Sequence, residues 1–344
     1  MRRFLHVTKK ALLFILMVPF VILGSLWIWN AFVDELPDDK VNFGVTFSNY
    51  YATELGLDWK ETYLAILDDL DVRNIRLAAY WSEIEPENNA FNFESLDFEV
   101  NEAAARNAKI ILVVGQKVPR WPECFIPSWA REHENYRGEL LEYVGTVVTR
   151  YKDVPNIVYW QIENEPFLAR FGDCAIFEIE ALDEEIALVK SLDSRPILVT
   201  DSGELGDWVR ARERGDVFGT TMYRDVWFRR TIRFRYPLPP TWFQFKDFVS
   251  RAFSDADSTQ KVIVVEMQAE AWAKDPIPYI SLDEQLKHMN FEGLKENIIY
   301  SKKAGFPDIY LWGVEWWYYL KEVHGMPEFW DYAKTLFQKQ ESSI

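Results

Sequence analysis

The chain has 344 residues, of which 49% are hydrophobic and 16% are aromatic. This length fits two average domains or one large α/β barrel. The formal net charge of −16 repels phosphate backbones, so we expect no nucleic-acid partner. The few histidines form no paired motif, and the cysteines lack metal-ligand spacing, so we expect no metal and no organic cofactor.

An uncharged apolar run covers residues 11–29 and would span roughly 28 Å as a helix. Basic residues precede the run and acidic residues follow it: Arg2, Arg3, Lys9, Lys10, then Asp34, Glu35, Asp38 and Asp39. This asymmetry predicts a cytoplasmic basic tail at residues 1–10, a transmembrane signal anchor at 11–29, and an extracytoplasmic remainder. A cleaved signal peptide and a buried soluble helix are the alternatives.

Residues 30–40 are acidic, contain Pro37, and predict a short linker. From residue 41 onward, short apolar segments alternate with amphipathic ones. The expected strands are 41–47, 74–79, 109–114, 157–162, 196–200, 217–222, 261–265 and 308–313. The expected helices are 58–71, 95–107, 137–151, 177–192, 204–214, 242–253, 283–304 and 327–339. Eight strands alternating with eight helices predict a single α/β domain over residues 41–344, a (β/α)8 TIM barrel.

A doubly wound sheet would show the same alternation of strands and helices. The glycine-rich phosphate-binding motif that marks a dinucleotide fold is missing after the first strand. Polar and aromatic residues cluster instead just after most of the expected strands, where a barrel forms its catalytic face. The barrel is therefore the favoured interpretation.

Two glutamates each end a β-branched apolar run. Glu165 lies in Asn164-Glu165-Pro166 after the fourth expected strand, and Glu266 ends the seventh. Cleavage of a glycosidic bond requires two facing carboxyl groups, one acting as an acid and one as a nucleophile or base. Glu163, two positions before Glu165, is a further strand-end carboxylate, which we interpret as part of a structural ion pair.

With Tyr223 ending the sixth strand, this pattern resembles the clan A glycoside hydrolases, which are TIM barrels and include families 5, 39 and 42. The resemblance covers most of residues 41–340. It implies a retaining enzyme in which Glu165 is the acid/base and Glu266 is the nucleophile. It also implies that Asn164 hydrogen-bonds the 2-hydroxyl of the sugar.

The same resemblance assigns roles to other side chains. Arg76 on the second strand and Tyr223 on the sixth are the expected donors that keep Glu266 ionised. Trp312, on the last strand, is expected to pack against the face of a bound sugar ring, although packing within the protein is an open alternative for this indole. Three further indoles are candidates for contact with sugar, again with packing or loop anchoring as the alternative: Trp81, Trp121 and Trp316.

If the barrel prediction holds, Cys124 and Cys174 lie in the loops after strands three and four, on one face. Export from the cytoplasm permits a disulfide. A bridge would close a loop of about fifty residues and stabilise the fold by roughly 4 kcal/mol on the chain-entropy account. Two unpaired structural cysteines are the alternative.

Together these features predict a membrane-anchored, extracytoplasmic glycoside hydrolase whose partner is a carbohydrate, a neutral β-linked oligosaccharide or polysaccharide. A transglycosylase that remodels surface glycan is an alternative that uses the same residues. A catalytically silent, membrane-tethered glycan-binding protein is another. The sequence does not predict the oligomeric state.

Overall fold

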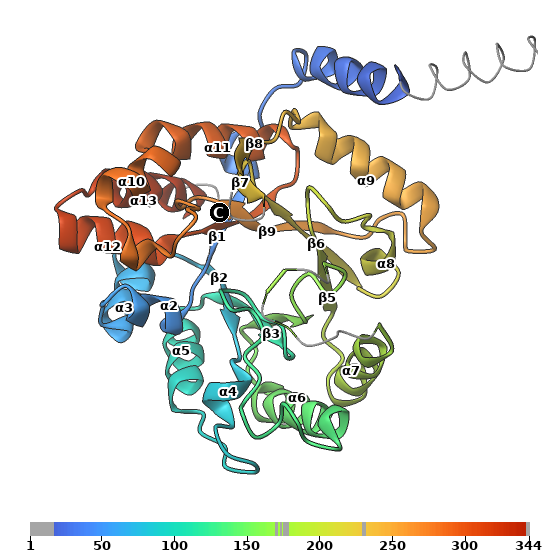
Figure 1. Ribbon diagram of the computed structural model, residues 1–344, viewed down its shortest axis with the longest axis vertical. Coiled ribbons are helices and arrows are strands. Elements are labelled where there is room, and N and C mark those ends of the chain that lie inside the picture. Colours follow the sequence, from blue (N-terminus) through green and yellow to red (C-terminus); the bar gives the residue numbers. More distant parts are fainter. Residues whose placement is uncertain (1–16, 169–170, 173, 175–178, 229–231, 342–344) are drawn as a thin grey trace, which may run out of the picture.

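The computed structural model describes residues 17–168, 171–172, 174, 179–228 and 232–341. Parallel strands close into a barrel in the order β1-β10-β9-β6-β5-β4-β3-β2, with helices around it (Figure 1). The barrel strands are β1 (Asn42–Thr46), β2 (Asn74–Ala78), β3 (Lys109–Val114), β4 (Ile157–Ile162), β5 (Ile197–Asp201), β6 (Val217–Met222), β9 (Val262–Gln268) and β10 (Asp308–Trp312). The predicted (β/α)8 barrel is confirmed.

The outer layer consists of amphipathic helices that turn their apolar sides toward the strands. They are α3 (Trp59–Asp68), α5 (Glu94–Ala105), α6 (Tyr136–Tyr151), α7 (Ile179–Leu192), α8 (Val209–Arg212), α9 (Thr241–Phe253), α10 (Leu282–His288), α11 (Phe291–Lys303) and α13 (Glu328–Glu341). The helix expected over 283–304 is two helices, because Met289 is extended and the Asn290 side chain caps α11 by accepting from the Gly293 N–H.

Several elements were not predicted, and they follow the carboxyl ends of strands. They are α2 (Asn49–Glu54), α4 (Trp81–Ile84), α12 (Val314–His324) and the antiparallel hairpin of β7 (Asp225–Phe228) and β8 (Ile232–Arg235). Gly313 is the N-cap residue of α12, and its φ of 129° suits glycine. A Cβ there would lie 2.5 Å from the Cβ of Glu270, so the close approach also requires glycine.

The barrel interior is filled by alternate strand residues. One cluster of buried side chains comprises Ile111, Leu198, Val217, Ile263, Val265 and Tyr310, with Tyr159 packed against it. A cavity of about 900 Å³ lies beyond Tyr159 and Tyr310, at the end of the barrel where the strands begin. Glu165 and Glu266 lie toward the opposite end, where the strands finish.

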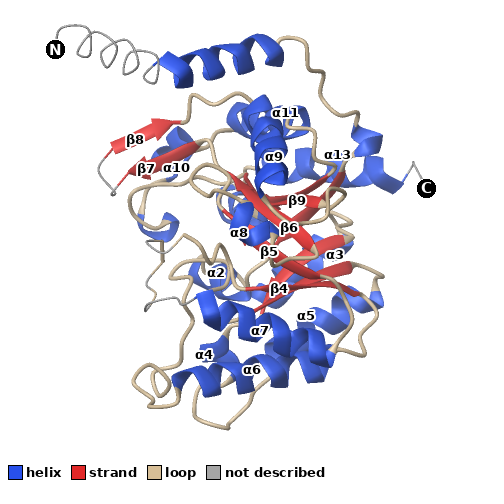
Figure 2. Ribbon diagram, turned by 90° about the vertical axis from the view of Figure 1, so that its right-hand side faces the viewer, coloured by secondary structure: helices blue, strands red, loops and turns tan. Residues whose placement is uncertain are grey.

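Residues 17–30 form a helix outside the barrel wall, joined to β1 by a segment that includes the short 3-10 turn η1 (Asp38–Lys40) (Figure 2). Within the described part of the chain, no helix combines the length and the apolar character that crossing a membrane requires. Residues 11–16 of the predicted anchor lie outside the described residues. The anchor and the domain bounds therefore stay predictions.

Candidate active site

The end of β4 presents three polar residues on a backbone of unusual conformation. Glu163 has a φ of 58° and Glu165 has a φ of 44°, both in the left-handed region that non-glycine residues rarely adopt. The Glu165 N–H donates a 2.8 Å hydrogen bond to Thr200 Oγ1 on β5. Such backbone strain persists where neighbouring contacts hold it, and it is concentrated at functional sites.

Glu163 supports this turn. Its fully buried carboxylate accepts hydrogen bonds from the backbone N–H groups of Gln116, at 2.9 Å, and Lys117, at 2.6 Å. The structural role that we expected for Glu163 is therefore fulfilled by backbone hydrogen bonds, and the interpretation as an ion pair is corrected. Gly115 makes room for this carboxyl group, since a Cβ there would lie 2.5 Å from it.

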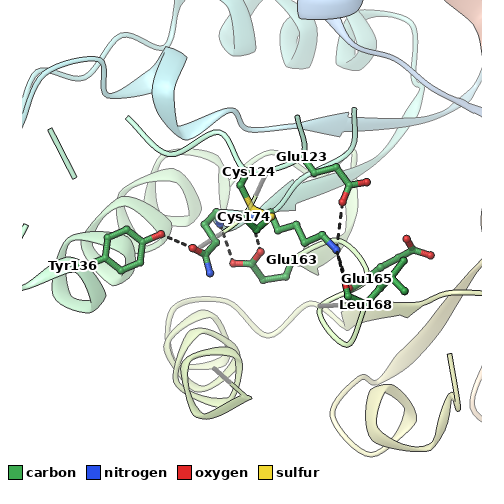
Figure 3. The surroundings of a disulfide bond; sticks show 9 residues. Glu123, Cys124, Tyr136, Glu163, Glu165, Leu168 and Cys174 are labelled. Atoms are coloured by element: carbon green, nitrogen blue, oxygen red, sulfur yellow. Dashed lines mark hydrogen bonds and ion pairs between the residues drawn. A yellow bond between two sulfur atoms is a disulfide. The ribbon is translucent and has the colours of Figure 1, made fainter. Parts of the chain in front are cut away.

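Lys117 also holds the turn. Its Nζ donates to the backbone carbonyl oxygens of Glu165, at 3.1 Å, and Leu168, at 3.3 Å, and pairs with Glu123 at 3.3 Å. Figure 3 shows Glu123, Glu163 and Glu165 gathered beside the disulfide between Cys124 and Cys174. This bridge ties the loop after β3 to the loop after β4, with Cα atoms 5.2 Å apart.

Glu266 lies on β9, and Arg76 on β2 binds it. The Arg76 guanidinium is fully buried and donates from Nη1 to Glu266 Oε1 at 2.8 Å. It also donates from Nε to Gln161 Oε1 and from Nη2 to Asn164 Oδ1, each at 2.8 Å. One guanidinium therefore links the end of β4 to the carboxylate on β9.

Residues at the end of β6 contact both glutamates. The Thr221 hydroxyl donates to Glu165 Oε1 at 2.9 Å, and the Tyr223 hydroxyl donates to Glu266 Oε2 at 2.9 Å. Residues two positions apart along a strand project on the same side. The carboxyl groups of Glu165 and Glu266 therefore converge at the same end of the barrel, although β5 and β6 separate their strands.

The two carboxyl groups have different electrostatic surroundings. Burial raises the pKa of Glu165 well above its usual range, and the charge of Glu266 raises this pKa further, against smaller opposing effects from Lys117 and Thr221. Glu266 instead receives two hydrogen bonds, one from a cation, which stabilise its negative charge. Burial and the Glu266 charge raise the pKa of Tyr223, so its phenol stays protonated and donates. The surroundings therefore favour the protonated form of Glu165, whereas Glu266 accepts hydrogen bonds from Arg76 and Tyr223.

The candidate tryptophans differ in position. Trp81 and Trp316 have no exposed surface. The Trp81 ring stacks on Tyr143 and the Trp316 ring packs against Phe329. Both are packing residues here, and the interpretation that they contact sugar is corrected. Trp121 is 51% exposed, in the loop after β3.

Trp312 lies close to the site but is largely covered. Its indole N–H donates to Glu270 Oε1 at 2.7 Å, and the Arg120 guanidinium lies 4.1 Å from the centre of its ring. Arg120 is also paired with Glu270 and with Glu315, at 2.7 Å to the latter. This buried charge cluster borders the candidate site and was not predicted from the sequence.

Other missed residues have a signal in retrospect. Gln161 lies two positions before Glu163, the neighbour of Asn164, and Thr221 lies two positions before Tyr223. Residues at this spacing along a strand project from the same face. Arg120 and Lys117 come from the loop after β3 and carry no such periodicity. Among the described residues, we find no cluster of three His, Cys, Asp or Glu side chains able to hold a metal ion.

Comparison with known proteins gives matches to part of the chain. A family model described as "Beta-galactosidase", glycoside hydrolase family 42, matches residues 50–179, which include Arg76, Asn164 and Glu165. The curated β-galactosidase Bga of Halorubrum lacusprofundi is 28% identical over 139 residues, covering 35% of this chain and 19% of that protein. This chain thus spans about a fifth of the curated relative that it matches.

Solved structures share the fold. A GH5_18 structure from Bifidobacterium longum has a TM-score of 0.57 at 14% identity, covering 79% of this chain and 69% of that chain. Endo-glycoceramidase II from Rhodococcus sp. has a TM-score of 0.51 at 14% identity, covering 79% and 72%.

The fold, the paired carboxyl groups and these matches confirm the predicted resemblance to the clan A glycoside hydrolases, the class to which this chain is related. Since the family 42 match covers less than half of the chain, we assign no single family within the clan.

Proposed function

We propose that this protein is a retaining glycoside hydrolase that cleaves β-linked, neutral oligosaccharides or polysaccharides by double displacement. The observation that carries the proposal is the opposite environment of two converging carboxyl groups. Burial and a neighbouring charge favour the protonated form of Glu165, whereas Arg76 and Tyr223 donate hydrogen bonds to ionised Glu266. A retaining glycosidase requires this combination of acid and nucleophile.

In the first step, the carboxylate of Glu266 attacks the anomeric carbon while Glu165 gives its proton to the oxygen of the leaving group. The products are a glycosyl ester on Glu266 and the released alcohol. In the second step, ionised Glu165 removes a proton from water, whose oxygen attacks the anomeric carbon. The ester bond breaks, Glu266 is again a carboxylate, and Glu165 is again protonated.

Asn164 is the proposed ligand of the sugar 2-hydroxyl. Arg76 can only donate, so it fixes the Oδ1 atom of Asn164 toward itself. The Nδ2 group of Asn164 is buried and has no hydrogen-bond partner among the described residues. An unpaired buried donor is costly, and a sugar hydroxyl would satisfy it. We propose Trp312 and half-exposed Trp121 as the indoles nearest to bound sugar.

The test is hydrolysis of p-nitrophenyl β-glycosides by the full chain, beginning with the β-galactoside, because the matched family and the curated relative are described as β-galactosidases. Glu266→Ala is expected to lower kcat by at least about 10³-fold. Glu142→Ala, an exposed glutamate on α6, is the control and should leave kcat unchanged. Equal rates for wild type and Glu266→Ala remove the proposal.

The role of Glu165 has its own test. Glu165→Ala should slow cleavage of phenyl glycosides by about 10²–10⁴-fold, because these leaving groups need a proton. Dinitrophenyl glycosides should be much less affected in the first step. Product analysis at high concentrations of acceptor sugar separates hydrolysis from transglycosylation.

We also propose that the N-terminal segment holds the protein at a membrane with the barrel outside the cytoplasm. The uncharged run 11–29, with basic residues before it and acidic residues after it, supports this orientation. Fractionation of cells, followed by protease digestion from the outside, tests it. Recovery of the whole chain in the cytoplasmic fraction would overturn it.

A further inference from the structure

Helix 17–30 exposes a large amount of apolar surface. Phe20 is 76% exposed, Val21 is 60% and Ile28 is 67%, and Phe32 just beyond the helix is 81% exposed. Soluble proteins scatter such side chains singly and rarely group them on one short segment. Most of the apolar side chains of this helix therefore pack against no other part of the described chain. Such a surface is typical of one that binds another molecule.

Helix α9 has a second apolar surface. Its inner side buries Phe243 and Ser250 against the barrel. On its other sides, Phe248 is 71% exposed and Phe253 is 76% exposed, and Phe245, on the turn before Phe248, is half-buried. A helix in the outer layer of a soluble barrel usually turns polar residues outward. Helix α9 instead carries aromatic side chains on both its inner and outer faces.

These two surfaces lie on the same side of the molecule. The Thr241 hydroxyl, at the start of α9, donates a 2.8 Å hydrogen bond to the backbone carbonyl of Leu26. The Trp27 indole donates a 3.2 Å hydrogen bond to the carbonyl of Pro237. Leu26 is only 5% exposed, so the helix contacts the barrel at this point. Figures 1 and 2 show helix 17–30 above α9, beside the barrel wall and at neither of its ends.

We propose that helix 17–30 and the outer face of α9 together form a docking surface for a lipid bilayer. The chain before this helix favours this partner over a protein. Residues 11–16 are apolar and uncharged, and four basic residues occur among the first ten. An apolar surface continuous with a run flanked by basic residues matches acyl chains beside headgroups.

The docking fixes the orientation of the barrel. The bilayer contacts the wall at α9, so the end of the barrel where the strands finish, with Glu165 and Glu266, opens along the membrane rather than into it. Because the chain has a net charge of −16, the contact depends on apolar burial rather than on anionic lipid. Vesicles of phosphatidylcholine, which have no net charge, are therefore the right probe.

The experiment places an environment-sensitive fluorophore on α9 of the full chain by Phe248→Cys. Because both native cysteines are bonded to each other, only the introduced thiol is labelled. Thr149→Cys, at an exposed position on α6, is the matched control. With phosphatidylcholine vesicles that carry a spin-labelled lipid, fluorescence at position 248 should be quenched several-fold, and fluorescence at 149 should be unchanged.

Three results overturn the proposal. The first is a full chain that does not float with the vesicles. The second is flotation with equal quenching at the two positions, or with none at 248. The third is a spectral shift at 248 that appears without vesicles and follows dimer formation in light scattering, which would assign the surface to a second copy. Phe253→Ser in the chain labelled at position 248 should lower the quenching several-fold, whereas Thr149→Ser should not. Hydrolytic activity is not a readout here, so failure of this proposal and failure of the proposed enzyme function are distinguishable.

Discussion

Thr221 and Tyr223, two positions apart at the end of β6, each donate a 2.9 Å hydrogen bond to a different one of the two candidate catalytic carboxyl groups. Thr221 lies on β6 and Tyr223 directly follows this strand, and both hydroxyls reach the candidate site. Thr221 contacts the proposed acid, Glu165, and Tyr223 contacts the proposed nucleophile, Glu266. The end of one strand therefore contacts both carboxyl groups of the proposed reaction, and substitutions there should separate the two proposed roles.

Tyr223→Phe removes one donor from Glu266 without changing the ring. A hydrogen bond to a charged group contributes about 1.5–3 kcal/mol. We therefore expect kcat/KM to fall by about 10–100-fold with little change in melting temperature. Tyr300→Phe is the control, because its buried hydroxyl donates at 2.8 Å to the Leu238 carbonyl outside the site. A similar loss of activity in both variants would contradict the assigned role.

Thr221→Val removes the donor to Glu165 with little change in volume. This hydrogen bond favours the ionised carboxylate and lowers the Glu165 pKa, so its loss should raise that pKa further. Since the acid must be protonated, the alkaline limb of the kcat/KM profile should move to higher pH. A shift of the alkaline limb to lower pH would oppose the assignment of Glu165.

Arg76→Lys keeps the positive charge but cannot make three hydrogen bonds in one plane. Asn164 and Gln161 lose their donor, so we expect kcat to fall by about 10²–10³-fold, the loss typical of a misplaced electrostatic donor. Arg212→Lys is the matched control, since Arg212 is equally buried but binds Ser250 and Gln260 away from the site. The prediction fails if both variants lose activity in proportion to their folded fraction.

Glu185 is a fully buried carboxyl group beside Glu163. Burial raises the pKa of Glu163 from about 4.5 to about 7. Burial is also the main cause of the raised pKa of Glu185, and the charge of Glu163 is the second cause. Since the folded pKa values exceed the unfolded ones, the free energy of unfolding should be highest below pH 4.5. It should fall as the pH rises through about 7, by a few kcal/mol.

Glu185→Gln removes one of the two charges that form at high pH. The melting temperature at pH 8 should therefore rise relative to wild type, with little change at pH 5. Glu142→Gln, exposed on α6, is the control and should have no effect at either pH. A variant that is destabilised more at pH 8 than at pH 5 would contradict this account of the pair.

The sequence predicted the barrel well because its strands are buried on both faces and contrast sharply with their surroundings. The expected ranges 109–114, 157–162 and 217–222 coincide with β3, β4 and β6. It predicted less where a single side chain decides the local structure, as at Asn290, whose cap divides the helix expected over 283–304. Helix α12 falls between the strand expected over 308–313 and the helix expected over 327–339, where no element was predicted.

The candidate site was partly predictable for the same reason. Glu165 and Glu266 stood out because each closes an apolar strand run, and the resemblance to the clan A glycoside hydrolases added Arg76 and Tyr223. Arg120 reaches Glu270 and Glu315 from a loop, and such a contact leaves no pattern in the sequence. The sequence also does not distinguish indoles that pack in the core from indoles that are exposed. Trp81 and Trp121 both follow strands, but Trp81 is buried and Trp121 is half exposed.

The most direct test of the central claim is mass spectrometry of the full chain after reaction with dinitrophenyl 2-deoxy-2-fluoro-β-glycosides of galactose, glucose and mannose. The fluorine slows the second step, so a glycosyl ester accumulates on the nucleophile of a retaining enzyme. We predict one sugar bound per chain, on the peptide that contains Glu266, and none on Glu266→Ala. A chain that hydrolyses the corresponding unfluorinated glycoside but forms no adduct, or forms it on another residue, would contradict the account.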